Sequence, residues 1–121
     1  MGAFQNREFG RNGEDRAASF LESHGFEILN RNYRYGKAGE IDIIARKGDL
    51  LVFVEVKSRR GECFGGPLYS INQSKKKTIR FIASHYLLSH PSLDTKAILC
   101  RFDMIAIDNA GIEWIEDIFR Q

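Results

Sequence analysis

Three charged residues lie within or directly after apolar, strand-like segments of the chain. Asp42 lies in the β-branched run 41–45, Glu55 lies in the almost unbroken apolar run 50–56, and Lys57 follows that run directly. Short runs of β-branched and aliphatic residues are typical of strands. Because uncompensated charges in a core are costly and tend to mark function, these three residues are the first candidates for chemistry.

Gly48 and Asp49 separate the two runs and are typical of a tight turn, since Gly accepts positive φ and Asp tolerates it. A two-residue or a four-residue loop at this turn pairs the runs as antiparallel strands with Asp42 opposite Glu55. A three-residue loop would shift the pairing by one residue and place the two acids on opposite faces. In the first register, Lys57 projects from the same face as Glu55.

Two carboxylates opposite each other on a sheet would lie about 5 Å apart at Cβ and would repel. A raised pKa on one acid, a neighbouring cation such as Lys57, or a bound divalent metal can relieve this repulsion. Mg²⁺ suits such a site because it usually binds one or two carboxylates together with substrate phosphate oxygens. The pattern predicts a metal-dependent phosphodiesterase; a structural ion pair of Glu55 with Lys57 is the plainer alternative.

A first helix is expected to begin with Asn12 as its N-cap, and residues 1–11 are expected to form a loose arm. Ala17 and Leu21 belong to the inward stripe of this helix, and Glu14 lies on the same stripe. Glu14 has two interpretations of equal weight. It is an acid stabilised by the helix macrodipole, or it is a third carboxylate that leans over the sheet toward the metal.

Six residues are candidates for contacts with nucleic-acid phosphates: Arg59, Arg60, Gln73, Lys76, Lys77 and Arg80. The first two follow Lys57 where its strand ends. The other four form one stripe, without an acid, at the start of a helix expected from residue 70 or 72 to about 89. The first turn of this helix would favour phosphate, whereas a solvated basic face is the commoner explanation of such a stripe.

The chain has 121 residues, 43% of them hydrophobic and 28% charged, as expected for one soluble domain over residues 1–121. A net charge of +2 means that nucleic-acid binding would need a local basic patch. Cys63 and Cys100 form no CxxC motif, which argues against zinc and a disulfide framework and fits the cytoplasm. No run approaches the roughly 20 apolar residues of a membrane span, so no membrane partner is expected.

The order helix, three strands, helix, strand predicts an α/β fold. Three antiparallel strands would be followed by a right-handed helical crossover, which places a strand over residues 95–107 parallel to the run 50–56. A short edge strand is expected over residues 112–115. Asp103 lies two residues from Arg101 on the last long strand, which favours a structural ion pair. This is the αβββαβ core of the restriction-endonuclease-like fold, a mixed sheet flanked by helices.

Asp42 with Glu55-Val56-Lys57 resembles the PD-(D/E)-x-K signature of the nucleases with that fold, although Ile41 replaces the proline. The resemblance is closest to the bacterial UPF0102 family, also called the YraN family, which is similar in core to archaeal Holliday-junction resolvases. It is carried by residues 12–15, 25–34, 39–45, 52–59 and 101–103.

The resemblance implies that Asp42 and Glu55 ligate Mg²⁺ or Mn²⁺, with Glu14 as a further candidate ligand. Lys57 would orient or help activate the attacking water. Gln73 with Lys77 loosely resembles the glutamine-containing motif on the corresponding helix of many such nucleases. The resemblance supplies no established substrate.

We therefore expect a metal-dependent nuclease that acts on DNA. A small domain offers little surface for reading bases, so cleavage selective for branched or junction DNA, by a homodimer, fits better than sequence-specific cutting. The alternative is a non-catalytic nucleic-acid-binding module of repair or uptake machinery. Asp42 and Glu55 argue against this alternative, because two acids repel phosphate unless a metal lies between them.

Overall fold

The computed structural model describes the backbone of residues 2–58 and 73–120 and the side chains of residues 13–58 and 73–119. The elements, in chain order, are helix α1 (Gly2–Ser23), strands β1 (Glu27–Tyr35), β2 (Gly39–Lys47) and β3 (Leu50–Ser58), helix α2 (Gln73–Ser89), the 3₁₀ turn η2 (Pro91–Leu93), strands β4 (Leu99–Asp108) and β5 (Gly111–Ile115), and the 3₁₀ turn η3 (Ile118–Arg120). No helix in these ranges combines the length and apolarity needed to cross a membrane.

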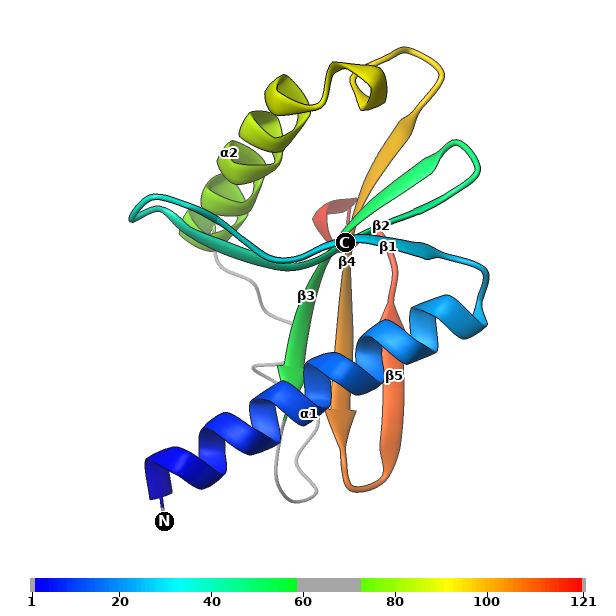
Figure 1. Ribbon diagram of the computed structural model, residues 1–121. Coiled ribbons are helices and arrows are strands. Elements are labelled where there is room, and N and C mark those ends of the chain that lie inside the picture. Colours follow the sequence, from blue (N-terminus) through cyan, green and yellow to red (C-terminus); the bar gives the residue numbers. More distant parts are fainter. Residues whose placement is uncertain (1, 59–72, 121) are drawn as a thin grey trace.

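The strands form one five-stranded sheet in the order β1-β2-β3-β4-β5. All neighbouring pairs are antiparallel except β3 and β4, which run parallel. The α2 helix belongs to the crossover between these two parallel strands (Figure 1). The predicted α/β class and the predicted strand order are both confirmed, and the sheet and its two helices are consistent with a restriction-endonuclease-like core.

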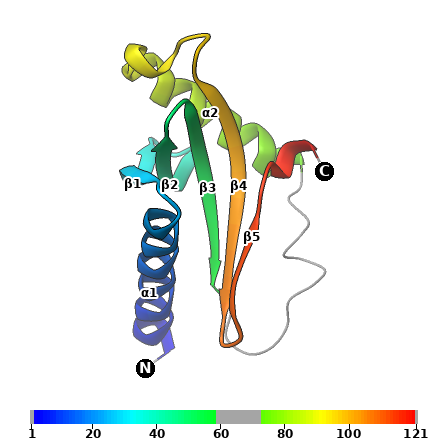
Figure 2. The ribbon, with the colours of Figure 1, turned by 90° about the vertical axis from the view of Figure 1, so that its right-hand side faces the viewer.

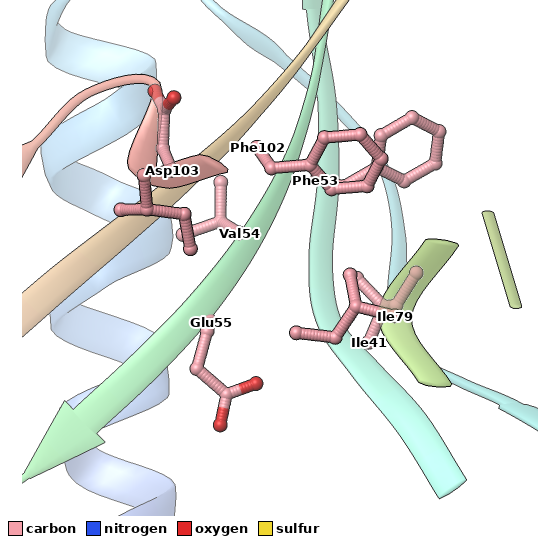
Figure 3. Close-up of a pocket in the computed structure, with 8 residues that line it drawn as sticks. Ile41, Phe53, Val54, Glu55, Ile79, Phe102 and Asp103 are labelled. Atoms are coloured by element: carbon pink, nitrogen blue, oxygen red, sulfur yellow. The ribbon is translucent and has the colours of Figure 1, made fainter. Parts of the chain in front are cut away.

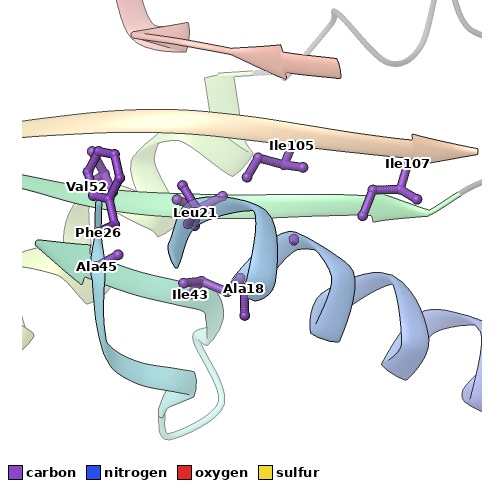
Figure 4. Close-up of a cluster of buried hydrophobic side chains, with 10 residues drawn as sticks. Ala18, Leu21, Phe26, Ile43, Ala45, Val52, Ile105 and Ile107 are labelled. Atoms are coloured by element: carbon purple, nitrogen blue, oxygen red, sulfur yellow. The ribbon is translucent and has the colours of Figure 1, made fainter. Parts of the chain in front are cut away.

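The two helices cover opposite faces of the sheet (Figures 1 and 2). On the α1 face, Ala17 and Leu21 are fully buried against the sheet, as their helical spacing predicted. That cluster contains Ala17, Ala18, Leu21, Phe26, Ile43, Ala45, Val52, Val54, Ile105 and Ile107 (Figure 4). The α2 face buries Ile41, Ile44, Leu51, Phe53, Ile79, Ile82, Ala83, Tyr86 and Leu93. The central strands are thus apolar on both sides because a helix covers each side.

The expected loose arm over residues 1–11 and the expected N-cap at Asn12 are corrected. The α1 helix begins at Gly2, so Asn12 lies inside it. Residues 2–11 include Ala3, Gln5, Arg7 and Glu8, which all have good helix propensity. The segment also contains Gly2 and Gly10, so propensity alone does not explain why the helix begins before Asn12.

The β4 strand begins at Leu99 rather than at residue 95, where the sequence pattern placed it. Pro91–Leu93 forms a 3₁₀ turn whose Leu93 is buried, and the Ile98 amide then bonds the Thr95 carbonyl in a further turn. The Leu99 amide donates to the Asp49 carbonyl at 2.7 Å, which starts the pairing with β3. The connection is folded rather than extended because its own turns satisfy these backbone groups.

Asp103 is fully buried on β4, and its carboxylate accepts four hydrogen bonds. Arg101 donates two hydrogen bonds, at 2.9 and 2.8 Å. The Trp114 indole and the Asp117 amide each donate one more, both at 2.9 Å. The predicted ion pair with Arg101 is confirmed. The hydrogen bonds from Trp114 and Asp117 attach β5 and the residues after it to β4.

Candidate functional site

The candidate site lies where β2 and β3 separate. The two strands are paired from Lys47 opposite Leu50 to Ile43 opposite Val54, which is the register predicted from the Gly48-Asp49 turn. Both strands continue beyond the last pair, but they diverge. Figure 1 shows the β1–β2 hairpin turning toward α2 while β3 continues along β4. Asp42 and Glu55 are the first residues of each strand beyond the last pair.

We call the opening between β2 and β3 beyond Ile43 and Val54 the fork. Here the Asp42 side chain, rather than a backbone carbonyl, is the hydrogen-bond acceptor for β3. Its carboxylate Oδ2 accepts a hydrogen bond from the Val56 amide at 2.8 Å. Ile41 packs on the α2 face and Ile43 on the α1 face, although a regular strand would place both on one face. The β2 strand therefore breaks its alternation at Asp42.

The pKa of Asp42 is raised from 3.8 to about 7. Burial is the main cause, because the charged carboxylate loses its hydration, and the negative charge of Glu55 is the second. Glu14 and Glu40 raise the pKa further, while the Val56 hydrogen bond lowers it. A divalent cation would reverse this balance by stabilising the ionised form.

The Glu55 side chain projects from β3 on the α2 side of the fork. Its side chain is 10% exposed, and its Oε1 lies 3.6 Å from the Lys57 ammonium and 3.4 Å from that of Lys75 on α2. Figure 3 shows its carboxylate directed away from the stacked rings of Phe53 and Phe102. The ion pair with Lys57, which was the plainer alternative for this motif, is present, and the ammonium of Lys75 also lies beside Glu55.

Glu14 lies on the α1 side of the fork, close enough to Asp42 to raise its pKa. The Asn32 amide donates to both Glu14 carboxylate oxygens, at 3.0 and 3.2 Å, and Arg31 lies 3.7 Å from one of them. Asn32 has a positive φ of 52°. This conformation is uncommon outside glycine but accessible to Asn.

Gly13 fixes how closely α1 approaches the end of β3. It is buried, and a Cβ atom at this position would collide with the Ser58 hydroxyl. A larger residue here would force the Ser58 side chain to move, so the glycine allows the close approach of α1 to β3. This contact holds Glu14, the next residue, beside the strand that carries Glu55 and Lys57.

The donor atoms suit a hard divalent cation held by two carboxylates. Within residues 13–58 and 73–119, no group of three or more Asp, Glu, His or Cys side chains converges into a metal site. Asp42 and Glu55 are the two that meet at the fork, and Glu14 is held by Asn32 and Arg31. Two carboxylates leave coordination positions for water and substrate oxygens, as Mg²⁺ commonly requires.

The predicted phosphate-binding stripe on α2 divides into two parts. Gln73 and Lys77 are exposed. Arg80 stacks over the Phe119 ring at 4.6 Å, and Lys76 lies 6.0 Å from the same ring. These last two residues therefore contact the C-terminal segment. Arg59 and Arg60 lie outside the described residues.

Sequence reasoning missed two residues of this site, Lys75 and Asn32. Lys75 lies outside the stripe that Lys76, Lys77 and Arg80 form, and only the crossover brings it to Glu55. Asn32 lies within a strand where nothing pairs it with Glu14. Its one available signal was its type, since Asn tolerates the left-handed conformation that aims it at α1.

The fold and this site together define an α/β protein with a restriction-endonuclease-like core and a pair of acids at a strand fork. The chain belongs to the uncharacterised protein family UPF0102, whose family model matches residues 13–107. This match spans Glu14, Asp42, Glu55 and Lys57, and it confirms the family that the sequence motifs predicted.

Relatives from distant bacteria match most of the chain. The UPF0102 protein of Dechloromonas aromatica (strain RCB) is 46% identical over 110 residues, covering 91% of this chain and 87% of the relative. That of Dictyoglomus turgidum (strain DSM 6724 / Z-1310) is 49% identical over 102 residues, covering 84% and 83%. That of Shewanella loihica (strain ATCC BAA-1088 / PV-4) is 41% identical over 110 residues, covering 91% and 92%.

Proposed function

We propose that this protein is a metal-dependent nuclease that hydrolyses phosphodiester bonds of DNA, with a preference for branched or junction structures. The observation that carries the proposal is the meeting of Asp42 and Glu55 at the strand fork, with Lys57 and Lys75 beside Glu55. Two neighbouring acids can bind a divalent cation, and two lysines beside them can bind the oxygens of a phosphodiester.

A purely structural role explains Asp42 poorly. In the part of the chain that the structure describes, no Lys, Arg or His forms an ion pair with it. Its charged neighbours are instead the acids Glu55, Glu14 and Glu40. Asp103 shows the contrast, since its buried carboxylate receives four hydrogen bonds, two of them from a guanidinium. An ionised carboxylate that is largely buried among acids is costly, so Asp42 either takes up a proton or binds a cation.

Asp42 and Glu55 would hold Mg²⁺ or Mn²⁺ between them. When bound, such an ion neutralises charge on the scissile phosphate and lowers the pKa of an attacking water. The Val56 amide fixes the Asp42 carboxylate in place, so one ligand is preorganised on the backbone of β3.

Lys57 and Lys75 supply the positive charge that Asp42 and Glu55 lack. The two lysine side chains are 40% and 44% exposed, while their ammonium groups lie 3.6 and 3.4 Å from the nearly buried Glu55 carboxylate. A partly exposed ammonium can donate hydrogen bonds to a phosphate oxygen, or hold an attacking water, without leaving its carboxylate partner. We assign Lys57 the role of orienting the water and Lys75 that of binding phosphate.

Backbone phosphates beyond the scissile one would be held by Gln73 and Lys77. Both are exposed in the first turns of α2, where unpaired backbone amides also favour anions. Such contacts add affinity without reading sequence. This supports recognition of DNA structure rather than of a base sequence.

The test is cleavage of labelled single-stranded, duplex, flap and four-way-junction DNAs with Mg²⁺, with Mn²⁺ and with EDTA. We expect cutting of the branched DNAs that requires metal and falls at least about a hundredfold in Asp42→Asn, Glu55→Gln and Lys57→Met. Asp49→Asn and Lys96→Met are matched controls, because both side chains are exposed and lie away from the fork.

The outcomes separate the proposal from its rival. Metal-dependent cutting that survives in Asp42→Asn and Glu55→Gln would show that the activity comes from elsewhere. Binding to DNA without cutting, under both metals, would favour the non-catalytic nucleic-acid-binding module.

A further inference from the structure

An exposed aromatic cluster lies beside α2, apart from Asp42 and Glu55. Tyr35, at the end of β1, stacks on His85 of α2 with ring centroids 3.7 Å apart. Phe81 packs edge-on against both rings, at 5.7 and 4.6 Å. Tyr35 and Phe81 remain 40% and 50% exposed. We propose that this cluster stacks against an unpaired base of the nucleic acid whose phosphate lies at the strand fork, an inference that rests on the proposed function.

A groove lies between the start of β2 and the first turns of α2, near both the aromatic cluster and the candidate site in the chain. It is lined by Ala38, Gly39, Glu40, Ser74, Lys75, Thr78 and Ile79. Lys75 in this lining contacts Glu55 of the candidate site. Thr78 in the same lining is followed, one helical turn along α2, by Phe81, and Ala38 lies three residues after Tyr35. A strand of nucleic acid in the groove would therefore bring its phosphates to Lys75 and its bases toward the rings.

The charges around the cluster favour a polyanion. The α2 helix contains no acid over its whole length. Lys77 is exposed one turn before Phe81, and Arg34 and Lys37 flank Tyr35 in the sequence. The acid nearest to them in the groove lining is Glu40, which already lies 3.8 Å from Arg34. Cations beside exposed aromatic rings form the arrangement that binds unpaired nucleotides.

A second copy of this chain fits the same surface less well. A twofold contact would place the same patch on both partners and so bring Lys77 and its neighbouring cations against their own copies. A nucleic acid instead supplies phosphates for the cations and a flat ring for Tyr35 and Phe81. Every base has such a face, so the contact would be tolerant of sequence.

This contact would create structural selectivity. Bases inside a duplex are stacked and cannot reach a protein ring, whereas bases at a flap, gap or junction can. Tyr35 and Phe81 would thus distinguish branched from fully paired DNA, while Lys75 and Lys77 hold the backbone of either.

The experiment measures binding of the full chain to two labelled DNAs of equal charge, in EDTA so that nothing is cut. One is a fully paired duplex, and the other carries an unpaired 2-aminopurine at a flap. The variants are Phe81→Leu, Tyr35→Leu and the double substitution, which remove rings but keep apolar bulk. Phe81→Trp and Tyr35→Phe keep a ring. Leu88→Ala is the control, because Leu88 is 70% exposed on the same helix and has no place in the cluster.

We expect the wild type to quench 2-aminopurine on binding. The double variant should lose the quenching and bind the flap DNA about tenfold more weakly, with duplex affinity unchanged. Both ring-keeping variants and Leu88→Ala should behave as the wild type does. Equal flap affinity and equal quenching in the double variant would overturn the proposal, and so would a dimer, seen by sedimentation, that the double variant abolishes.

The same samples separate this inference from the proposed function. Quenching by a wild type that cuts no DNA with Mg²⁺ or Mn²⁺ would support base stacking and overturn the nuclease. Metal-dependent cutting by a double variant that keeps the wild-type preference for the flap would support the nuclease and overturn base stacking. No binding of either DNA by the wild type would overturn both.

Discussion

The carboxylate of Asp42 accepts a hydrogen bond from the backbone amide of Val56 at 2.8 Å, directly beyond the point where β2 and β3 stop pairing. A side chain here satisfies a donor that a strand would otherwise satisfy. The opening between the two strands is therefore a stable part of the fold, and the acid that stabilises it also faces the candidate site.

Asp42 should make the metal-free protein less stable as the pH rises from about 4 to about 7. The pKa of this acid is raised from 3.8 to about 7 in the fold, so the folded state binds more protons than the unfolded state across that interval. Asp42→Asn keeps an acceptor for Val56 but cannot ionise. Its stability relative to the wild type should grow with pH by about 2–4 kcal/mol, given about 1.4 kcal/mol per pKa unit.

Urea denaturation in EDTA at pH 5 and pH 8 measures this difference. Asp49→Asn is the control, because that acid is exposed at the far turn of the same hairpin. Adding Mg²⁺ at pH 8 should stabilise the wild type but not Asp42→Asn. A stability difference that is the same at both pH values would contradict the buried, protonated state of Asp42.

Gly13→Ala should destabilise the protein although alanine is the better helix former. The new Cβ would collide with the Ser58 hydroxyl, and relieving such overpacking typically costs about 1–3 kcal/mol. Ser58→Gly removes the obstacle, so the double variant should recover stability that the single variants lose. The coupling in this double-mutant cycle should be at least about 1 kcal/mol.

Thermal and chemical denaturation of the four proteins in the cycle provide the measurement. Ser19→Ala is a reference for helix propensity, since Ser19 is exposed on the same helix. Additive effects of the two substitutions would mean that α1 does not press on β3 at this point.

Lys75→Met should lower cleavage of branched DNA about ten- to hundredfold in kcat/KM. The Lys75 ammonium lies 3.4 Å from Glu55 and the side chain is 44% exposed, so the substitution removes a cation from the site at little cost in stability. Lys96→Met is the exposed control. Wild-type kinetics in Lys75→Met, together with a loss in Lys57→Met, would leave Lys57 as the single lysine that the reaction needs.

Much of the fold was predictable because local signals and the global arrangement agree. Gly48 and Asp49 predict the turn and the turn predicts the register, which holds up to Ile43 opposite Val54, the pair directly before Asp42 and Glu55. The sequence pattern also predicted the parallel pairing of β3 with β4, since a helix between two strands forces a crossover.

The parts that were not predictable depend on tertiary contacts. No short spacing links Lys75 to Glu55 or Asn32 to Glu14, and both pairs form only after α2 and α1 pack on the sheet. Arg80 was expected to face solvent alone, but its guanidinium also packs on the ring of the distant Phe119, while the side chain stays exposed. The helix start at Gly2 was missed because the capping pattern at Asn12 is a weak local signal and the glycines at positions 2 and 10 argue against a helix before it.

The irregular course of β1 has a consequence for solubility. This strand forms one edge of the sheet, and its outer residues include the exposed Arg31, Asn32 and Arg34. An edge strand that is regular and apolar would be a template for strands of other molecules, leading to aggregation. The positive φ of Asn32 distorts the edge, and the two arginines charge it. The distortion that brings Asn32 to Glu14 therefore also protects the open edge of the sheet from strand addition.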